Sequence, residues 1–430
     1  MNCKRTELVQ LLAISVVMTL IFLFVNANPI NGDSLLAWPI AESVNHSWYS
    51  GGDLIIEAAK NTNFLLYKIL AHFPWYQDNL PLRDTIIFTP IICIYGFLWA
   101  LFFYKISKSF KVSVLTLAIF LFSDNKLGLH WSYSPLPFLI SYTSIHFLQI
   151  AALILFYIKR YKVSFFLLAL TSFLHPATAL SYFVTFAGIA LFREKNIKQL
   201  FLYSLAFLIP FGINFVLFLG GNKTGSLGEE HFKIYELFQN HVYVQDHFHE
   251  GYLYFAGCLG LIFSLRRFYT SEFLKFSFLF YSISIFFSLL WLINAYFIKN
   301  TQFLYFYYIM RIFYLLKPLT LFAITWGLFN YFERLDIKAL NNWRKAFTFL
   351  VVFLFVKCLF RYSSFDSALM VLSLIALVGN RLKMSMTFVA LFILSNAIKF
   401  ETFLKLSTSG YLSLPLLVVI LWMINKKRPA

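Results

Sequence analysis

Long apolar runs recur from one end of the chain to the other, and they constrain its fold more than any other feature. Runs of about 17–25 residues match the length that a helix needs to cross the hydrocarbon core of a membrane. Hydrophobic residues make up 60% of the 430 residues, whereas soluble domains contain about 45–50%. A β-barrel would instead alternate apolar and polar residues in segments of about ten. The sequence therefore predicts an all-α polytopic membrane protein.

The spacing of the runs predicts about 14 transmembrane helices, with roughly 11 as the lower bound, in a single integral membrane domain over residues 1–430. The first run, 8–25, is expected to be an uncleaved helix. A long first extracytoplasmic loop at 26–84 should contain an amphipathic surface helix over its second half. A second extracytoplasmic loop is expected at 220–251 and a cytoplasmic loop at 330–345.

The charges lie between the apolar runs rather than along one binding surface. The net charge is +17, but Lys and Arg occur in short clusters that follow the positive-inside pattern. This distribution argues against a nucleic-acid partner and favours a multi-pass protein of the bacterial inner (plasma) membrane with both termini cytoplasmic. The same topology puts most acids outside, together with every histidine except His146. Titratable chemistry is thus expected on the outward face.

The segment SFFLLALTSFLHPATALSYFVTFAGIALF lies between two basic clusters, so it must cross and return. Pro176 removes a backbone donor and disfavours helix just before it. Two short spans, 163–175 and 177–192, are therefore predicted, with His175 at the turn. His175 could cap the hairpin, or it could donate to a substrate phosphate. Short broken helices are tolerated in membranes where they line a cavity.

The first outer loop carries a concentration of acids in the stretch NGDSLLAWPIAESVNHSWYSGGDLIIE. Asp33 and Glu42 are candidate catalytic carboxylates, because an outer carboxylate can act as a general base. Asp53 is a candidate substrate-binding residue. Simple helix capping is the competing interpretation for Asp33, and it fits Asp53 well because Asp53 follows two glycines and opens a helical pattern.

The stretch HVYVQDHFHEGY, in the second outer loop, groups three histidines and two acids. His247 and His249 are candidates for binding a phosphate or a sugar. Imidazoles and carboxylates also suit zinc or manganese, but the spacing matches no standard zinc motif, so no metal ligands are assigned. A plain polar loop is the remaining interpretation.

Two cations lie in a predicted span at 303–326. Arg311 would be about two turns deep, where a cation by default marks a ligand pathway or a buried partner. Its planar fork of donors matches phosphate oxygens. A structural ion pair with an outer acid is the alternative. Lys317 could join the same binding pocket or extend toward the inner interface.

These elements resemble the GT-C superfamily of integral membrane glycosyltransferases. Asp33, in NGD after one short span, occupies the place of that superfamily's first-loop acidic motif. The elements LHPATAL, HFHE and Arg311 are similar to bacterial GT-C-like and O-antigen-polymerase-like proteins. The departures are the lack of a second clear acidic motif and of a soluble C-terminal domain.

The resemblance implies transfer of a sugar or glycan from a polyprenyl-phosphate-linked donor to an extracytoplasmic acceptor, in surface polysaccharide or glycolipid assembly. Asp33 would be the base, and Arg311, His175 and His247 would hold the phosphate. The expected partners are this lipid-linked sugar and membrane lipids. The residues require no cofactor, although a divalent cation would suit the outer carboxylates. The alternatives are a repeat-unit polymerase and a non-enzymatic transporter or flippase for lipid-linked or anionic solutes.

Overall fold

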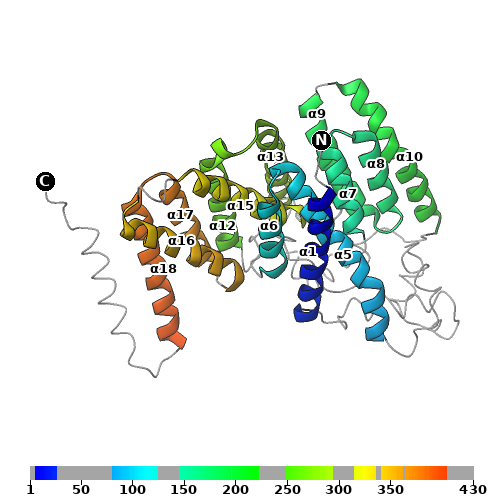
Figure 1. The fold of residues 1–430 in the computed structure, drawn as a ribbon. Coiled ribbons are helices and arrows are strands. Elements are labelled where there is room, and N and C mark those ends of the chain that lie inside the picture. Colours follow the sequence, from blue (N-terminus) through cyan, green and yellow to red (C-terminus); the bar gives the residue numbers. More distant parts are fainter. Residues whose placement is uncertain are drawn as a thin grey trace. The chain divides into compact units, whose positions relative to one another are not determined.

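The structure of the chain is a computed structural model that describes residues 5–26, 80–123, 145–194, 196–221, 248–293, 314–335, 340–361 and 364–403. Within these ranges it contains 13 α-helices and no strand (Figure 1). The all-α prediction is therefore confirmed for the described part of the chain. The helices belong to two compact units, and each unit is described by itself.

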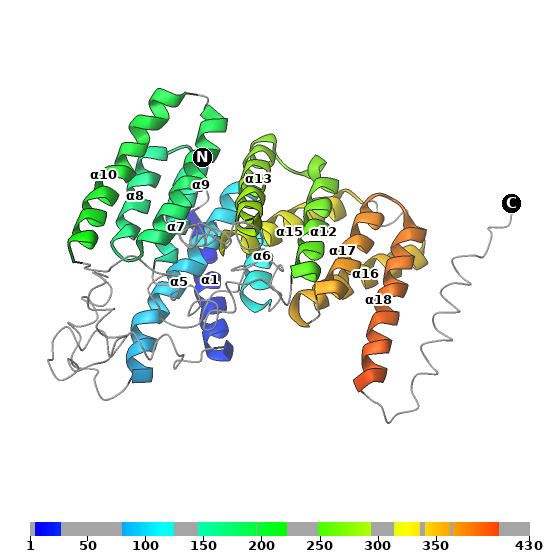
Figure 2. The same cartoon turned by 180° about the vertical axis from the view of Figure 1, so that it is seen from behind.

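The first unit comprises Met1–Leu121, Pro135–Val244 and Ser271–Tyr314. Helices α7 to α10 pack on one another, and they lie side by side in both views of the ribbon (Figure 1, Figure 2). The unit's helices are α1 (Arg5–Asn26), α5 (Leu80–Ser107), α6 (Phe110–Phe122, whose last residue is assigned to the second unit), α7 (His146–Tyr157), α8 (Tyr161–Ser172), α9 (Pro176–Glu194), α10 (Ile197–Gly221) and α13 (Ser271–Ile293).

Among the described residues, three helical stretches are long and apolar enough to cross a membrane, namely Arg5–Val25, Thr89–Ser107 and Ile197–Val216. The stretch in α10 leaves large apolar side chains exposed, including Leu202 at 63% and Val216 at 67%. Other apolar helices are shorter. The 12 residues of α7 or α8 extend only about 18 Å, less than the roughly 30 Å of a bilayer core. The full set of about 14 spans remains a prediction.

The predicted break at Pro176 is confirmed. Helix α8 ends at Ser172 and α9 begins at Pro176, so the segment forms two helices that pack on each other. Proline fits this first helical position because its missing N–H would have no intrahelical partner there. Helix α9 continues to Glu194, two residues beyond the expected span, because no residue in that stretch interrupts the helix.

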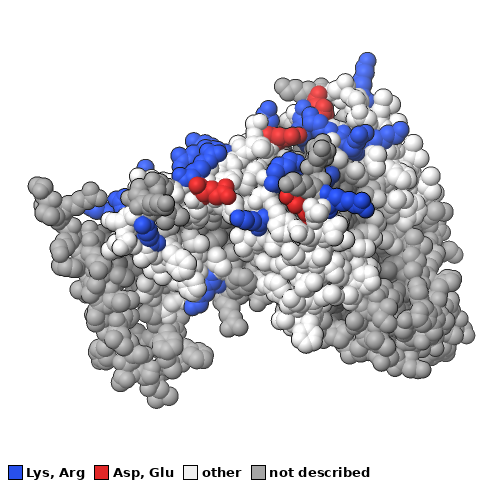
Figure 3. All heavy atoms as spheres, viewed as in Figure 1, with Lys and Arg blue, Asp and Glu red and all other residues white. Residues whose placement is uncertain are grey.

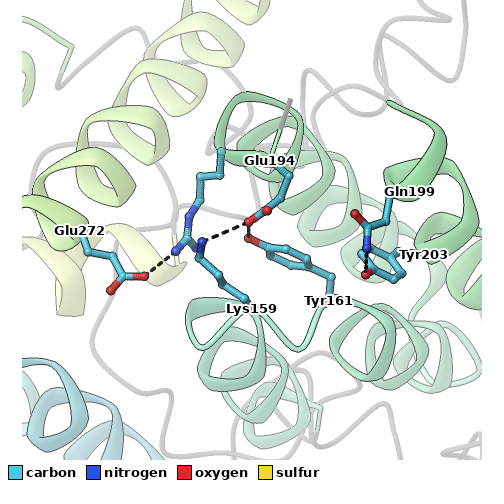
Figure 4. A network of polar contacts seen from close by, with 7 residues as sticks. Lys159, Tyr161, Glu194, Gln199, Tyr203 and Glu272 are labelled. Atoms are coloured by element: carbon cyan, nitrogen blue, oxygen red, sulfur yellow. Dashed lines mark hydrogen bonds and ion pairs between the residues drawn. The ribbon is translucent and has the colours of Figure 1, made fainter. Parts of the chain in front are cut away.

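Charged side chains tie several helix ends of the first unit together. Lys159, in the turn between α7 and α8, lies 3.4 Å from Glu194 at the end of α9, and Tyr161 donates a 2.7 Å hydrogen bond to the same carboxylate (Figure 4). Arg193 donates to Glu272 in the first turn of α13 at 2.9 Å. We call these five residues the Glu194 network.

Hydrogen bonding and charge perturb two groups of this network. The hydrogen bond from Tyr161, followed by the attraction of Lys159, lowers the pKa of Glu194 below its usual value near 4.5 despite partial burial. Burial and the bond to Glu194 raise the pKa of Tyr161. Glu194 is therefore ionised at neutral pH while it joins three helix ends.

The second unit comprises Phe122–Ser134, Gln245–Thr270 and Leu315–Ala430. A tight contact at a glycine marks its packing: a Cβ on Gly257 of α12 would lie 3.3 Å from Cγ1 of Val371 on α17. Small residues at such interfaces let membrane helices come together. Its elements are α12 (Phe248–Ser264), the 3₁₀ turn η4 (Arg266–Phe268), α15 (Leu316–Arg334), α16 (Asn342–Arg361), α17 (Ser364–Val378) and α18 (Leu382–Phe403).

Helices extend into both ends of the segment that is predicted to be a cytoplasmic loop at 330–345. Helix α15 continues through Arg334, and α16 begins at Asn342. Residues 330–334 extend the helix because they include no glycine or proline to end it. The cytoplasmic position of the segment remains a prediction.

Candidate functional site

A buried polar cluster lies between helices of the first unit. His146, in the first turn of α7, has its Nδ1 2.8 Å from Oε1 of Gln149 one turn later. The His146 ring lies 6.0 Å from that of Tyr95 on α5 and 4.8 Å from that of Tyr314. Tyr182, on α9, is fully buried in the same unit, and α9 packs against α7. We call these five residues the His146 cluster.

Members of the cluster are almost fully removed from the surface. Gln149 and Tyr182 are 0% exposed, and His146 is 8% exposed. The Gln149 amide nitrogen and the Tyr182 hydroxyl have no hydrogen-bond partner among the residues that the structure describes. A buried donor without a partner costs about 1–3 kcal/mol. Two such donors in one helix bundle therefore suit a bound oxygen acceptor.

The acceptor oxygen of Gln149 fixes the state of the histidine. Because Oε1 has no proton to give, Nδ1 of His146 must be the donor. In the neutral imidazole the lone pair then lies on Nε2, which is the arrangement of a general base. The cluster thus combines neutral donors with a potential proton acceptor. It contains no cation among its members, so it suits a hydroxyl or carbonyl oxygen better than a phosphate.

Helix geometry places His175 at the same level as His146. Helices α7 and α9 run in the same direction, since both end at the Glu194 network, and Phe156 stacks on Phe186 with ring centroids 4.6 Å apart. His146 lies ten residues before Phe156, and His175 lies eleven before Phe186. At 1.5 Å per residue both lie about 15–17 Å from that stacked pair.

His175 itself caps α9. Its Nδ1 accepts a hydrogen bond from the Thr178 backbone N–H at 3.3 Å and lies 2.8 Å from the Thr178 hydroxyl. This contact satisfies one of the free donors at a helix start. The capping interpretation of His175 is therefore confirmed. A neutral ring that accepts at Nδ1 carries its proton on Nε2.

Lys317 performs a structural task in the second unit. Its side chain is 1% exposed, and Nζ donates to the backbone oxygen of Ser123 at 2.6 Å. Ser123 directly follows the last residue of α6, where helix carbonyls lack partners and carry partial negative charge. The lysine therefore stabilises a helix end, and its substrate-binding role remains a prediction.

The other predicted site residues lie outside the described residues, and their roles remain predictions. They are Asp33, Glu42, Asp53, His247 and Arg311. The backbone of His249 belongs to the first turn of α12, while its side chain is not described. Arg311 precedes Tyr314, a member of the His146 cluster, by three positions in the sequence.

Sequence reasoning missed Gln149, Tyr95 and Tyr182. A signal for the first was present, because His146 is the one histidine predicted inside a span and Gln149 follows it by three residues, on the same helix face. Polar side chains inside a membrane helix are costly and mark function or interhelical contacts. The tyrosines gave no such signal, since aromatic residues are abundant throughout this chain.

Within the described ranges, no three His, Cys, Asp or Glu side chains are grouped closely enough to hold a metal ion. The chain was also compared with known proteins. No protein-family model, no curated protein and no solved structure matches it.

Proposed function

We propose that the chain is a membrane-embedded transferase that moves a sugar or glycan from a polyprenyl-phosphate-linked donor to an extracytoplasmic acceptor. The observation that carries this proposal is the His146 cluster. It offers two unpartnered buried donors and an imidazole whose Nδ1 donates to Gln149. Such a set can orient a hydroxyl and accept its proton. The apolar helices and the broken hairpin at Pro176 supply the membrane setting.

The orientation follows from the distribution of charge. Basic side chains of the first unit gather at the helix ends joined by the Glu194 network (Figure 3), and the positive-inside rule assigns such an end to the cytoplasm. The cluster residues His146, Gln149 and Tyr182 lie 10–13 residues from Lys159 or Glu194 along α7 or α9. That spacing corresponds to about 15–20 Å. The cluster would then lie in the outer half of the membrane, where a lipid-linked sugar enters from the outer leaflet.

In this proposal the roles are divided by charge. Asp33 and Glu42 would serve as bases near the outer surface. Arg311, with His175 and His247, would stabilise the phosphate that departs with its polyprenyl chain. The neutral His146 cluster would bind sugar hydroxyls. This division adds a sugar-binding group to the roles predicted from the sequence.

Transport is the second candidate, and one observation favours it. The cluster is enclosed by helices and lies at about the same height along the bundle as the helix break at Pro176. Many transporters bind their solute in such an arrangement. A transporter would move a lipid-linked or anionic solute without cleaving the bond to phosphate. The two functions therefore differ in whether carrier phosphate is released.

The deciding experiment measures that release. Purified protein in detergent micelles would receive a radiolabelled polyprenyl-phospho-sugar and a sugar acceptor, and the free carrier phosphate would be quantified. We expect turnover with the wild-type protein, none with Asp33→Asn and at least a tenfold loss with Gln149→Leu. Gln199→Leu, the same substitution at an exposed site, should keep full activity. Absence of turnover with every such donor would refute the transferase, and donor movement across proteoliposomes without cleavage would establish the transporter.

A further inference from the structure

The Glu194 network contains a cation whose hydrogen-bonding capacity is only partly used. The Arg193 side chain is 7% exposed, and its Nη2 bonds one oxygen of Glu272. Its other terminal nitrogen, Nη1, is buried and has no hydrogen-bond partner within the described part of the chain. A guanidinium normally forms paired hydrogen bonds with a planar anion. A buried charged donor without an acceptor is more costly than a neutral one, so this nitrogen points to an absent anionic ligand.

The surroundings of Arg193 are positively charged beyond the two ion pairs. Glu194 is already bonded by Lys159 and Tyr161, and Glu272 by Arg193. Further basic residues are exposed at the same helix ends, namely Arg160, Lys162, Lys198 and Lys275. Figure 3 shows blue side chains around the few red ones in this region. The excess of positive charge would attract a phosphate despite the neighbouring carboxylates.

The helices that carry this ion pair also expose apolar side chains. Phe192, next to Arg193 on α9, is 62% exposed, and Phe278 on α13, two turns after the start of that helix, is 71% exposed. Large exposed aromatic side chains of this kind mark contact with lipid or another apolar partner. A ligand that combines a phosphate with acyl chains satisfies both the guanidinium and these surfaces.

We propose that Arg193, with Lys159 and the basic residues around it, binds the phosphate of an anionic membrane phospholipid between the ends of α7, α9 and α13. The phosphate oxygen would accept from Nη1, and the acyl chains would lie along α9 and α13. Clusters of basic residues between membrane helices on the cytoplasmic side are suited to such headgroups. The proposal depends on membrane insertion of these helices and is independent of the transferase chemistry.

The test compares two substitutions that break the same ion pair. Arg193→Gln removes the donor, whereas Glu272→Gln removes only the carboxylate that competes with phosphate. Each variant would be incorporated into vesicles of three parts phosphatidylcholine to one part phosphatidylglycerol, extracted, and the retained phosphatidylglycerol counted by native mass spectrometry. We expect about a tenfold lower affinity for phosphatidylglycerol in Arg193→Gln, the scale of one charge-assisted hydrogen bond, and a higher affinity in Glu272→Gln.

Opposite effects of the two substitutions on lipid retention support the site. If the ion pair were purely structural, both variants would retain less lipid to the same extent. Arg160→Gln is the matched control, since it removes an exposed charge nearby. Equal losses in Arg160→Gln and Arg193→Gln would overturn the proposal in favour of general charge attraction. If Arg193→Gln does not fold, unchanged or reduced retention in Glu272→Gln overturns it alone. Displacement of the lipid by millimolar inorganic phosphate would overturn the role of the acyl chains.

Discussion

The buried pair of His146 and Gln149 allows a double-mutant cycle whose outcome can be worked out from the structure. The Nδ1–Oε1 contact is 2.8 Å, and both side chains are at least 92% buried by their exposed fractions of 8% and 0%. His146→Leu leaves the Gln149 amide without its partner, and Gln149→Leu leaves the Nδ1–H of His146 without its acceptor. Each single change should cost about 1–3 kcal/mol of unfolding free energy.

The double variant should behave differently from the sum of its parts. Replacing both partners with leucine removes the two polar groups that face each other, at nearly constant volume. Such a double replacement is close to neutral for stability. The interaction energy should therefore be about 1–3 kcal/mol, within the range found for residues in direct contact. If the cluster binds substrate, the double variant should be stable and inactive. Removal of a functional polar site commonly has this effect.

The measurement is unfolding in mixed micelles with increasing sodium dodecyl sulfate, followed by circular dichroism, for the wild type, both singles and the double. Gln199→Leu is the control and should change the unfolding free energy by less than about 0.5 kcal/mol, because Gln199 is exposed. A double variant destabilised by the full sum of the single effects would refute the proposed pairing. A stable double variant with full activity would refute the functional role.

Three further predictions concern packing, backbone conformation and pH. Gly327→Ala should destabilise the protein by about 1–3 kcal/mol, because the new Cβ would lie 2.9 Å from Leu265 and too close to the Tyr269 hydroxyl, which donates to the Ala323 carbonyl. The control Gly212→Ala, whose new Cβ would meet no atom within 4 Å, should be neutral or stabilising by up to about 1 kcal/mol. Equal effects of the two substitutions on unfolding in micelles would contradict the tight packing at Gly327. Lys108→Gly should stabilise the protein by about 0.5–1 kcal/mol, since Lys108 directly follows α5 and has a φ of 57°. A loss of stability would show that the lysine charge contributes more than the relief of backbone strain. The pKa of Glu194 is lowered by folding, so Glu194 contributes fully to the free energy of unfolding above its ordinary pKa, and this contribution is lost as the pH falls below about 4.5. Glu194→Gln should therefore make the free energy of unfolding depend less on pH below about 4.5. An unchanged pH dependence in this variant would exclude Glu194 as its source.

Much of the helical architecture could be predicted from the sequence because it depends on local pattern. The runs that predict 8–25, 85–104 and 199–219 correspond to α1, α5 and α10, and the break at Pro176 follows from the lack of a proline N–H. The end of a helix is harder to predict where polarity changes without a helix breaker, as at the end of α15. A membrane position for each helix is a further step that remains predicted.

Individual site residues were harder to predict, because their roles depend on neighbours distant in sequence. His175 could be a cap or a phosphate donor on sequence alone, and its contact with Thr178 establishes the cap. Lys317 was grouped with Arg311 by proximity in the chain, but its ammonium reaches the carbonyl of Ser123, 194 positions away. No pattern within one helix contains that information.

The sequence by itself determined that this chain forms apolar helices, where one of them breaks, and that basic residues lie in clusters between the apolar runs. These properties follow from hydrophobic run length, proline chemistry and charge placement, which act within a few turns of helix. Only the tertiary structure decided which polar side chains of different helices meet: His146 with Tyr95 and Tyr314, and Lys159 with Glu194. Burial of a polar group depends on the helices packed against it, and therefore on contacts that close over long stretches of chain.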